Sequence, residues 1–294
     1  MPQGDFGEAA MCSRIVFGEA AMCNRIVLVM ALASGLVGAG AIAQTPVVLP
    51  TLRTTPQGMR LDLEKPFHTR SPWLLVVTEG VPVKDFDGAD EPGALTLCLR
   101  RDPAGPCVSD PVTPRFRATT SDAPVAWDQH YLLTAKVVYP RGPNAAPLLL
   151  IVTGSLHSGD GNQAVYTQLL DYDSGRDEFL RVYGKSTGHN NNQEIRFIAD
   201  GPLRGSMISA EPQQRPPYGY WIEVNTLSHA GAYRQVLRYL SATRYNDGNS
   251  LAAIDSEMPN IERRLGLWKP GEPFPIPSAG CSKPTLRHSE LWCE

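Results

Sequence analysis

The sequence lacks the short motifs that mark several common enzyme classes. It has no H-E-x-x-H zinc motif, no phosphate-binding P-loop and no G-x-G-x-x-G dinucleotide loop. The G-x-S-x-G pattern occurs once, around Ser186, but it lies in a predicted strand of a hairpin and not at the strand-to-helix turn that the hydrolase nucleophile motif requires. The six histidines are scattered singly, as surface or hydrogen-bonded histidines usually are. No nucleophile, metal-hydrolase or nucleotide-dependent activity is therefore predicted.

Charge of one sign is also scarce. Lys and Arg number 27 against 30 Asp and Glu, which gives a net charge of −3, and no block of basic residues occurs. Nucleic acids and anionic lipids are bound through concentrated positive charge. Neither kind of partner is expected. Helical periodicity is almost absent too, which points to a chain made of strands.

The N-terminal part is predicted to be processing sequence. Phe6–Val16 (FGEAAMCSRIV) is repeated at once as Phe17–Val27 (FGEAAMCNRIV), so residues 1–21 are interpreted as a mis-assigned upstream segment with the natural start at Met22. Residues 22–43 have the layout of a signal peptide: a basic residue, a short apolar run and the small residues Ala41-Ile42-Ala43. The run is too short and too rich in Gly and Ala for a comfortable membrane span. We expect export to the periplasm or the exterior, and no stable membrane span after cleavage.

Four cysteines remain after residue 43, namely Cys98, Cys107, Cys281 and Cys293. An even number in an exported chain predicts two disulfides, and proximity in sequence favours Cys98–Cys107 and Cys281–Cys293 among three pairings. No C-x2-C pair occurs, which disfavours zinc.

Residues 44–294 are predicted to form one all-β domain. Within it, Leu148–Asn260 contains one strand–loop–strand–hairpin–strand pattern twice, and the segment from Trp73 repeats it again. We predict a β-propeller-like array of about four-stranded antiparallel sheets, with blade-like units at 73–140, 148–204 and 206–260. The tail 267–294 could join the N-terminal strands in a remaining sheet. A β-sandwich is the alternative, and one short helix is expected near 260–265, with Pro259 in its first turn.

An acidic loop follows the first apolar strand. The string DFDGADEPGALTL contains Asp85, Asp87 and Asp90, and alternating carboxylates around a glycine turn suit Ca²⁺. The string resembles the calcium loop of FG-GAP repeats in integrin-type propellers, and this resemblance implies a calcium ion held by those three residues. The alternative is an acidic, solvated turn with no cofactor.

The main candidate binding site is a run of carboxamides between two predicted strands. It comprises His189, Asn190, Asn191, Asn192, Gln193 and Glu194. Dense donor–acceptor pairs of this kind can hold sugar hydroxyls or a peptide backbone. Trp221, with Tyr218 and Tyr220 beside it, could add an aromatic face for stacking. The alternative is a loop whose asparagines only shape turns.

Three functions follow from these patterns. The leading hypothesis is an exported, non-catalytic β-domain that binds a carbohydrate or protein surface through its inter-strand loops. The second is a glycosidase-like hydrolase that uses a carboxylate pair. Candidates for that pair are Glu194, Glu211, Glu223, Asp255 and Glu257. The third is a structural envelope protein without a ligand.

Overall fold

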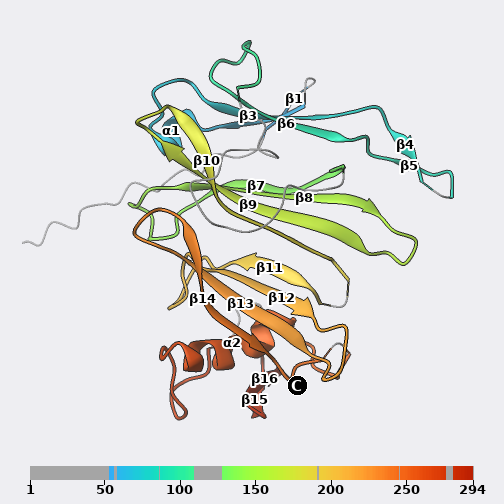
Figure 1. Ribbon diagram of the computed structural model, residues 1–294, viewed down its shortest axis with the longest axis vertical. Coiled ribbons are helices and arrows are strands. Elements are labelled where there is room, and N and C mark those ends of the chain that lie inside the picture. Colours follow the sequence, from blue (N-terminus) through green and yellow to red (C-terminus); the bar gives the residue numbers. More distant parts are fainter. Residues whose placement is uncertain are drawn as a thin grey trace, which may run out of the picture. The chain divides into compact units, whose positions relative to one another are not determined.

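The computed structural model shows an antiparallel β protein with three four-stranded sheets (Figure 1). The structure describes residues 53–55, 58–85, 87–108, 128–190, 192–244, 246–275 and 281–293. The predicted upstream segment 1–21 and signal peptide 22–43 lie outside the described residues, as does Asn191. The all-β prediction is confirmed, and the ring-like arrangement of the sheets stays a prediction.

Each four-stranded sheet is an up-and-down meander in chain order. The first sheet contains β1 (Arg53–Thr55), β2 (Gly58–Asp62), β3 (Leu74–Glu79) and β6 (Leu95–Arg100). The second contains β7 (Tyr131–Val138), β8 (Leu148–His157), β9 (Gln163–Asp173) and β10 (Glu178–Thr187). The third contains β11 (Glu194–Phe197), β12 (Met207–Pro212), β13 (Tyr220–Leu227) and β14 (Tyr233–Leu240).

The remaining elements are short hairpins and two helices. The hairpins are β4 (Val83–Lys84) with β5 (Asp90–Glu91), and β15 (Pro284–Arg287) with β16 (Glu290–Cys293). The helices are α1 (Glu64–Phe67) and α2 (Ala253–Arg264). Since β15 and β16 pair only with each other among the described strands, the tail does not join the N-terminal strands in one sheet.

The sheets are shifted by one strand relative to the predicted units. Strand β7 falls within the unit 73–140 but pairs with β8 in the second sheet. Strand β11 falls within 148–204 but pairs with β12 in the third. A continuous meander presents the same alternation of strand and turn throughout, so apolar runs alone do not mark the connection that crosses from one sheet to the next.

The second sheet is buried on both faces. Leu149 and Ile151 pack against the first sheet, whereas Leu148 and Leu150 pack in the core shared with the third. This explains why β8 reads as an unbroken apolar run instead of an alternating one. Aromatic rings also contact each other between the first and second sheets: the rings of Trp73, just before β3, and Phe179, in β10, meet edge-on at 5.4 Å.

Helix α2 covers the outer face of the third sheet, where Ile254 and Ile261 pack against Ile208, Ala210 and Ile222. The prediction of a helix near 260–265 was wrong in its start, because α2 begins at Ala253 and Pro259 lies inside it. Proline suits a first turn, which is why Pro259 suggested the helix start. The true N-terminus has no capping side chain of its own, so no local signal marks it. The short helix α1 was not predicted.

Candidate functional site

The carboxamide loop between β10 and β11 forms a turn that is bonded to itself. The Gln193 side-chain amide donates to Asn190 Oδ1 at 2.8 Å, and Gln193 Oε1 accepts from the backbone N–H of Gly188 at 3.1 Å. A Cβ at Gly188 would lie 2.5 Å from the Gln193 amide, so a larger residue there would displace the Gln193 side chain from these hydrogen bonds. Asn192 has φ +56°, a left-handed conformation that asparagine tolerates. These side chains mainly shape the loop.

Asn162 anchors the same loop from the β8–β9 turn. Its Oδ1 accepts hydrogen bonds from the backbone N–H groups of His189 at 3.1 Å and Asn190 at 3.3 Å. The structure thus brings His189, Asn190 and Gln193 together with a residue that sequence reasoning did not single out. Because their polar groups largely satisfy one another, the loop offers a ligand less than its composition suggests.

Glu194 lies on the face of the third sheet that packs against α2. Its Oε1 accepts a hydrogen bond from the backbone N–H of Ile254 at 3.2 Å, and its Oε2 accepts two from Arg196. Arg196 also pairs with Asp255 in the first turn of α2. Burial raises the pKa of Glu194, although the Arg196 charge opposes this. Glu194 and Asp255 therefore hold the helix against the sheet.

Trp221 belongs to a different group of polar side chains, which lies between the second and third sheets. Its indole N–H donates to Gln213 Oε1 at 2.8 Å. The Arg238 guanidinium lies 4.2 Å from the Trp221 ring centroid and donates to Glu223 Oε1 at 2.9 Å. Such stacking combines a cation–π contact with an ion pair and fixes both planar groups.

Lys185 connects this group to the second sheet. Its ammonium contacts Glu211 Oε1 at 2.8 Å and also contacts Glu223. We call Lys185, Glu211, Trp221, Glu223 and Arg238 the inter-sheet cluster. The Lys185 side chain is 13% exposed, whereas that of Arg238 is 48% exposed, so the cluster runs from a buried centre to an open rim.

Hydroxyl groups without partners border the inter-sheet cluster. Thr167 is directly opposite Lys185 in the β9–β10 pairing, and Ser209 is directly opposite Glu223 in the β12–β13 pairing. Opposite residues share a face of the sheet, so both side chains point toward the cluster. Thr187 follows Lys185 on the same face. The Oγ atoms of Thr167, Thr187 and Ser209 are buried and have no hydrogen-bond partner among the described residues. Buried hydroxyls normally have one.

The charges of the cluster stabilise one another. Burial opposes the charge of Lys185, but its hydrogen bonds to Glu211 and Glu223 and their negative charges outweigh this and raise the pKa of its ammonium. Burial likewise acts to raise the pKa of Glu223, yet Lys185 and Arg238 together lower it. Both groups are therefore charged at neutral pH.

Sequence reasoning named Trp221, Glu211 and Glu223 but missed Lys185, Arg238 and the three hydroxyls. The available signal was the alternation in β10: Lys185 and Thr187 occupy the face that carries apolar residues earlier in the strand. A polar residue at a core position is informative. The position of the sheet boundary was needed to recognise it.

The predicted metal site is arranged as a hairpin turn. Asp85 Oδ1 accepts hydrogen bonds from the backbone N–H groups of Asp87 at 2.9 Å and Ala89 at 2.7 Å, while Asp90 pairs with Lys84 at 2.8 Å. No group of three His, Cys, Asp or Glu residues that could hold a metal ion occurs within the described ranges. The three aspartates thus shape the β4–β5 hairpin.

Both predicted disulfides are confirmed. Cys98–Cys107 and Cys281–Cys293 have Cα–Cα distances of 5.3 Å and 5.4 Å. The last glutamate considered for catalysis, Glu257, is fully buried and accepts hydrogen bonds from Tyr239 at 2.6 Å and Thr243 at 2.5 Å. Glu257 lies on the buried side of α2.

Comparison with protein-family models, with curated proteins and with solved structures found no match. In the part of the chain that the structure describes, no helix has the length and apolar character needed to cross a bilayer.

Proposed function

We propose that this chain is an exported, non-catalytic β-domain that binds a carbohydrate at the inter-sheet cluster. The observation that carries the proposal is the set of three buried hydroxyls beside Lys185, Glu211 and Glu223 that have no hydrogen-bond partner in the described part of the chain. Sugar hydroxyls donate to carboxylates and accept from ammonium and guanidinium groups, so they match this mixture of donors and acceptors. Trp221 supplies apolar ring surface of the kind that sugar C–H groups contact.

The inter-sheet cluster suits a ligand better than the carboxamide loop that the sequence favoured. The carboxamide loop satisfies many of its own hydrogen bonds, and Glu194 is used by α2. In the inter-sheet cluster, Glu211 and Arg238 remain 38% and 48% exposed in their side chains. A ligand can therefore reach charged groups without first breaking the turn.

Export is supported by the two disulfides, because such bonds persist in oxidising compartments and are rare in reducing ones. We further propose that the three meanders are blades of a propeller-like array. Each has four antiparallel strands in chain order, and neighbouring sheets share apolar cores. A binding site between adjacent blade faces is consistent with that arrangement.

The test is glycan-array screening of the disulfide-bonded chain, followed by calorimetric titration of the best glycan. Arg238→Ala and Glu211→Gln are expected to weaken binding about tenfold each, as the loss of a charge-assisted hydrogen bond does. Arg234→Ala, at an exposed arginine of the same strand, is the matched control and should bind like the wild type. Failure of the wild type to bind any glycan, or equal binding by all three variants, would contradict the proposal.

A glycosidase-like activity is the second candidate, favoured by the pair Glu211 and Glu223. Both carboxylates contact the same ammonium, which places them within about 6 Å of each other, near the separation in retaining enzymes. One acid of such a pair must hold a proton, yet Lys185 and Arg238 lower the pKa of Glu223. Hydrolysis of aryl glycosides by the wild type, abolished by Glu223→Gln, would favour this candidate over binding alone.

A further inference from the structure

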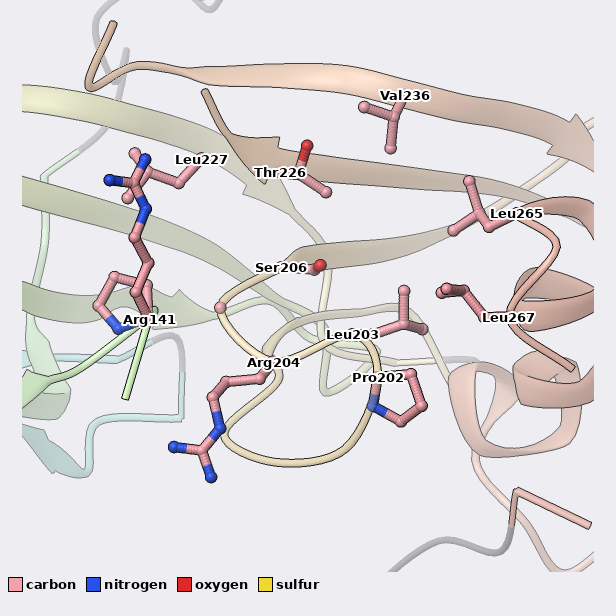
Figure 2. A pocket seen from close by; sticks show the side chains of 12 residues that line it. Arg141, Pro202, Leu203, Arg204, Ser206, Thr226, Leu227, Val236, Leu265 and Leu267 are labelled. Atoms are coloured by element: carbon pink, nitrogen blue, oxygen red, sulfur yellow. The ribbon is translucent and has the colours of Figure 1, made fainter. Parts of the chain in front are cut away.

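A separate pocket of about 360 Å³ opens at the other end of the third sheet (Figure 2). Ser206, just before β12, and Leu227, at the end of β13, line it, whereas Glu211 and Trp221 of the inter-sheet cluster lie at the opposite ends of these strands. The pocket is therefore distinct from the proposed carbohydrate site. Its volume is that of a small-molecule pocket and is too small for a protein segment with its own fold.

One side of the pocket is apolar. Leu203 forms a buried wall, and Leu265 and Leu267 approach it from the end of α2. Val236 and Leu267 also line the pocket although they are 48% and 43% exposed. Large apolar side chains that gather around a concavity while open to solvent mark a surface suited to an apolar ligand.

The other side carries positive charge. Arg141 and Arg204 line it, and in Figure 2 both guanidinium groups lie on the side away from Leu265 and Leu267. Arg141 donates one hydrogen bond to the Ser228 carbonyl at 2.9 Å, and Arg204 pairs with the exposed Asp200 at 2.6 Å. Each guanidinium has five N–H donors, and these contacts use one nitrogen of each group. The lining residues include no carboxylate.

We propose that this pocket binds a free fatty acid. The acyl chain would lie against Leu203, Leu265, Leu267 and Val236. The carboxylate would accept hydrogen bonds from Arg204, while Arg141 adds positive charge on the same side of the pocket. Burial of methylene groups drives such binding, and arginine recognises a carboxylate through paired N–H donors. The ligand is thus specified at both ends: an apolar chain at one and a single negative charge at the other.

Calorimetric titration of the full chain with dodecanoate, below its micelle concentration, tests the proposal. Leu267→Glu is expected to weaken binding at least tenfold, because it places a charge in the path of the chain and repels the carboxylate. Leu133→Glu is the matched control, since Leu133 is a leucine with the same exposed fraction of 43% that does not line this pocket. Both positions are open to solvent, so both variants should fold, which circular dichroism would verify.

The charge requirement is tested separately. Arg204→Ala should weaken dodecanoate binding about tenfold, and the wild type should bind dodecanol and dodecyltrimethylammonium at least tenfold more weakly than dodecanoate. No binding of dodecanoate, equal effects of Leu267→Glu and Leu133→Glu, or equal affinity for the acid and the alcohol would each overturn the proposal. None of these results depends on carbohydrate binding at the inter-sheet cluster.

Discussion

Glu194 accepts a hydrogen bond at 3.2 Å from the backbone N–H of Ile254, in the first turn of α2, although the two residues belong to different elements of the fold. The first N–H groups of a helix have no partner within it, and a carboxylate there also meets the positive end of the helix dipole. The residue before the helix, Ala252, has no side chain that could do this. Glu194, in β11, therefore caps the N-terminus of α2, which lies 60 residues further along the chain.

Replacement of Glu194 should affect the stability of the fold more than the binding of a glycan. Glu194→Ala is expected to reduce the free energy of unfolding by about 1–3 kcal/mol, because an N–H of α2 and part of the Arg196 charge lose their acceptor. Glu194→Gln keeps one acceptor oxygen and should lose less. Urea denaturation measures both, with Glu79→Ala at an exposed glutamate as the control. A loss from Glu79→Ala equal to that from Glu194→Ala would contradict the cap.

The carboxamide loop should respond to backbone conformation and not to the loss of a ligand contact. Asn192→Gly should change the free energy of unfolding by less than about 0.5 kcal/mol, since glycine adopts φ +56° freely. Asn192→Val should cost about 1–2 kcal/mol because a branched side chain is strained there. Denaturation of both variants and glycan titration of Asn192→Gly check this. A loss of glycan binding on Asn192→Gly would instead return the loop to the binding site.

Local patterns predicted more of this molecule than its long-range contacts. The strands of the second and third sheets, the cysteine pairs and the turn at Asp85 follow from apolar runs, spacing and turn residues, all of which act within about a dozen positions. Lys185 with Glu211, and Glu194 with Ile254, join residues far apart in sequence. The alternation in β10 places Lys185 on a face that is apolar earlier in the strand, but it does not show that the ammonium contacts two glutamates of another sheet. Such pairs depend on which two sheets face each other. The repeat pattern predicted the boundaries between sheets one strand away from where they lie.

Stability should fall as the pH rises from 5 to 8, because of Glu290. Burial and then the nearby Glu257 charge raise the pKa of Glu290 from 4.5 to about 7. In this range the folded protein holds a proton that the unfolded chain has released, so raising the pH favours unfolding, by about 2 kcal/mol in total. Glu290→Gln removes this dependence and should be the more stable protein at pH 8. Parallel pH profiles for the variant and the wild type would contradict the assignment.

Each disulfide should contribute to stability through a short loop. The bridges join cysteines 9 and 12 residues apart, for which loop-closure entropy predicts about 3 kcal/mol each. Cys98→Ser/Cys107→Ser and Cys281→Ser/Cys293→Ser should therefore lower the free energy of unfolding by similar amounts. Thermal denaturation of both double variants, with and without reductant, measures this. In each double variant, reductant should still cause a further loss, because one bridge remains, and a double variant that no longer responds to reductant would point to other pairings.

Lys185 should matter far more than an exposed lysine in an ion pair. Lys185→Met leaves Glu211 and Glu223 facing each other without the ammonium, at a cost of about 2–3 kcal/mol at pH 7. Lys84→Met is the control, because Lys84 and Asp90 have side chains 63% and 72% exposed and such pairs contribute less than about 1 kcal/mol. Urea denaturation of both variants compares the two costs. Equal costs would mean that the inter-sheet cluster is as solvated as the hairpin.

The cost of Lys185→Met should also shrink in acid. Lys185 and Arg238 outweigh the effect of burial and lower the pKa of Glu223, so its charge stabilises the fold above its unfolded pKa, near 4.5, and this stabilisation is lost as the pH falls through the lower folded value. Without Lys185, Glu223 is protonated more readily, so the variant loses less stability than the wild type when the pH falls. The stability difference between wild type and variant should therefore narrow between pH 6 and pH 3. A constant difference across that range would show that Lys185 acts through packing of its methylene chain and not through its charge.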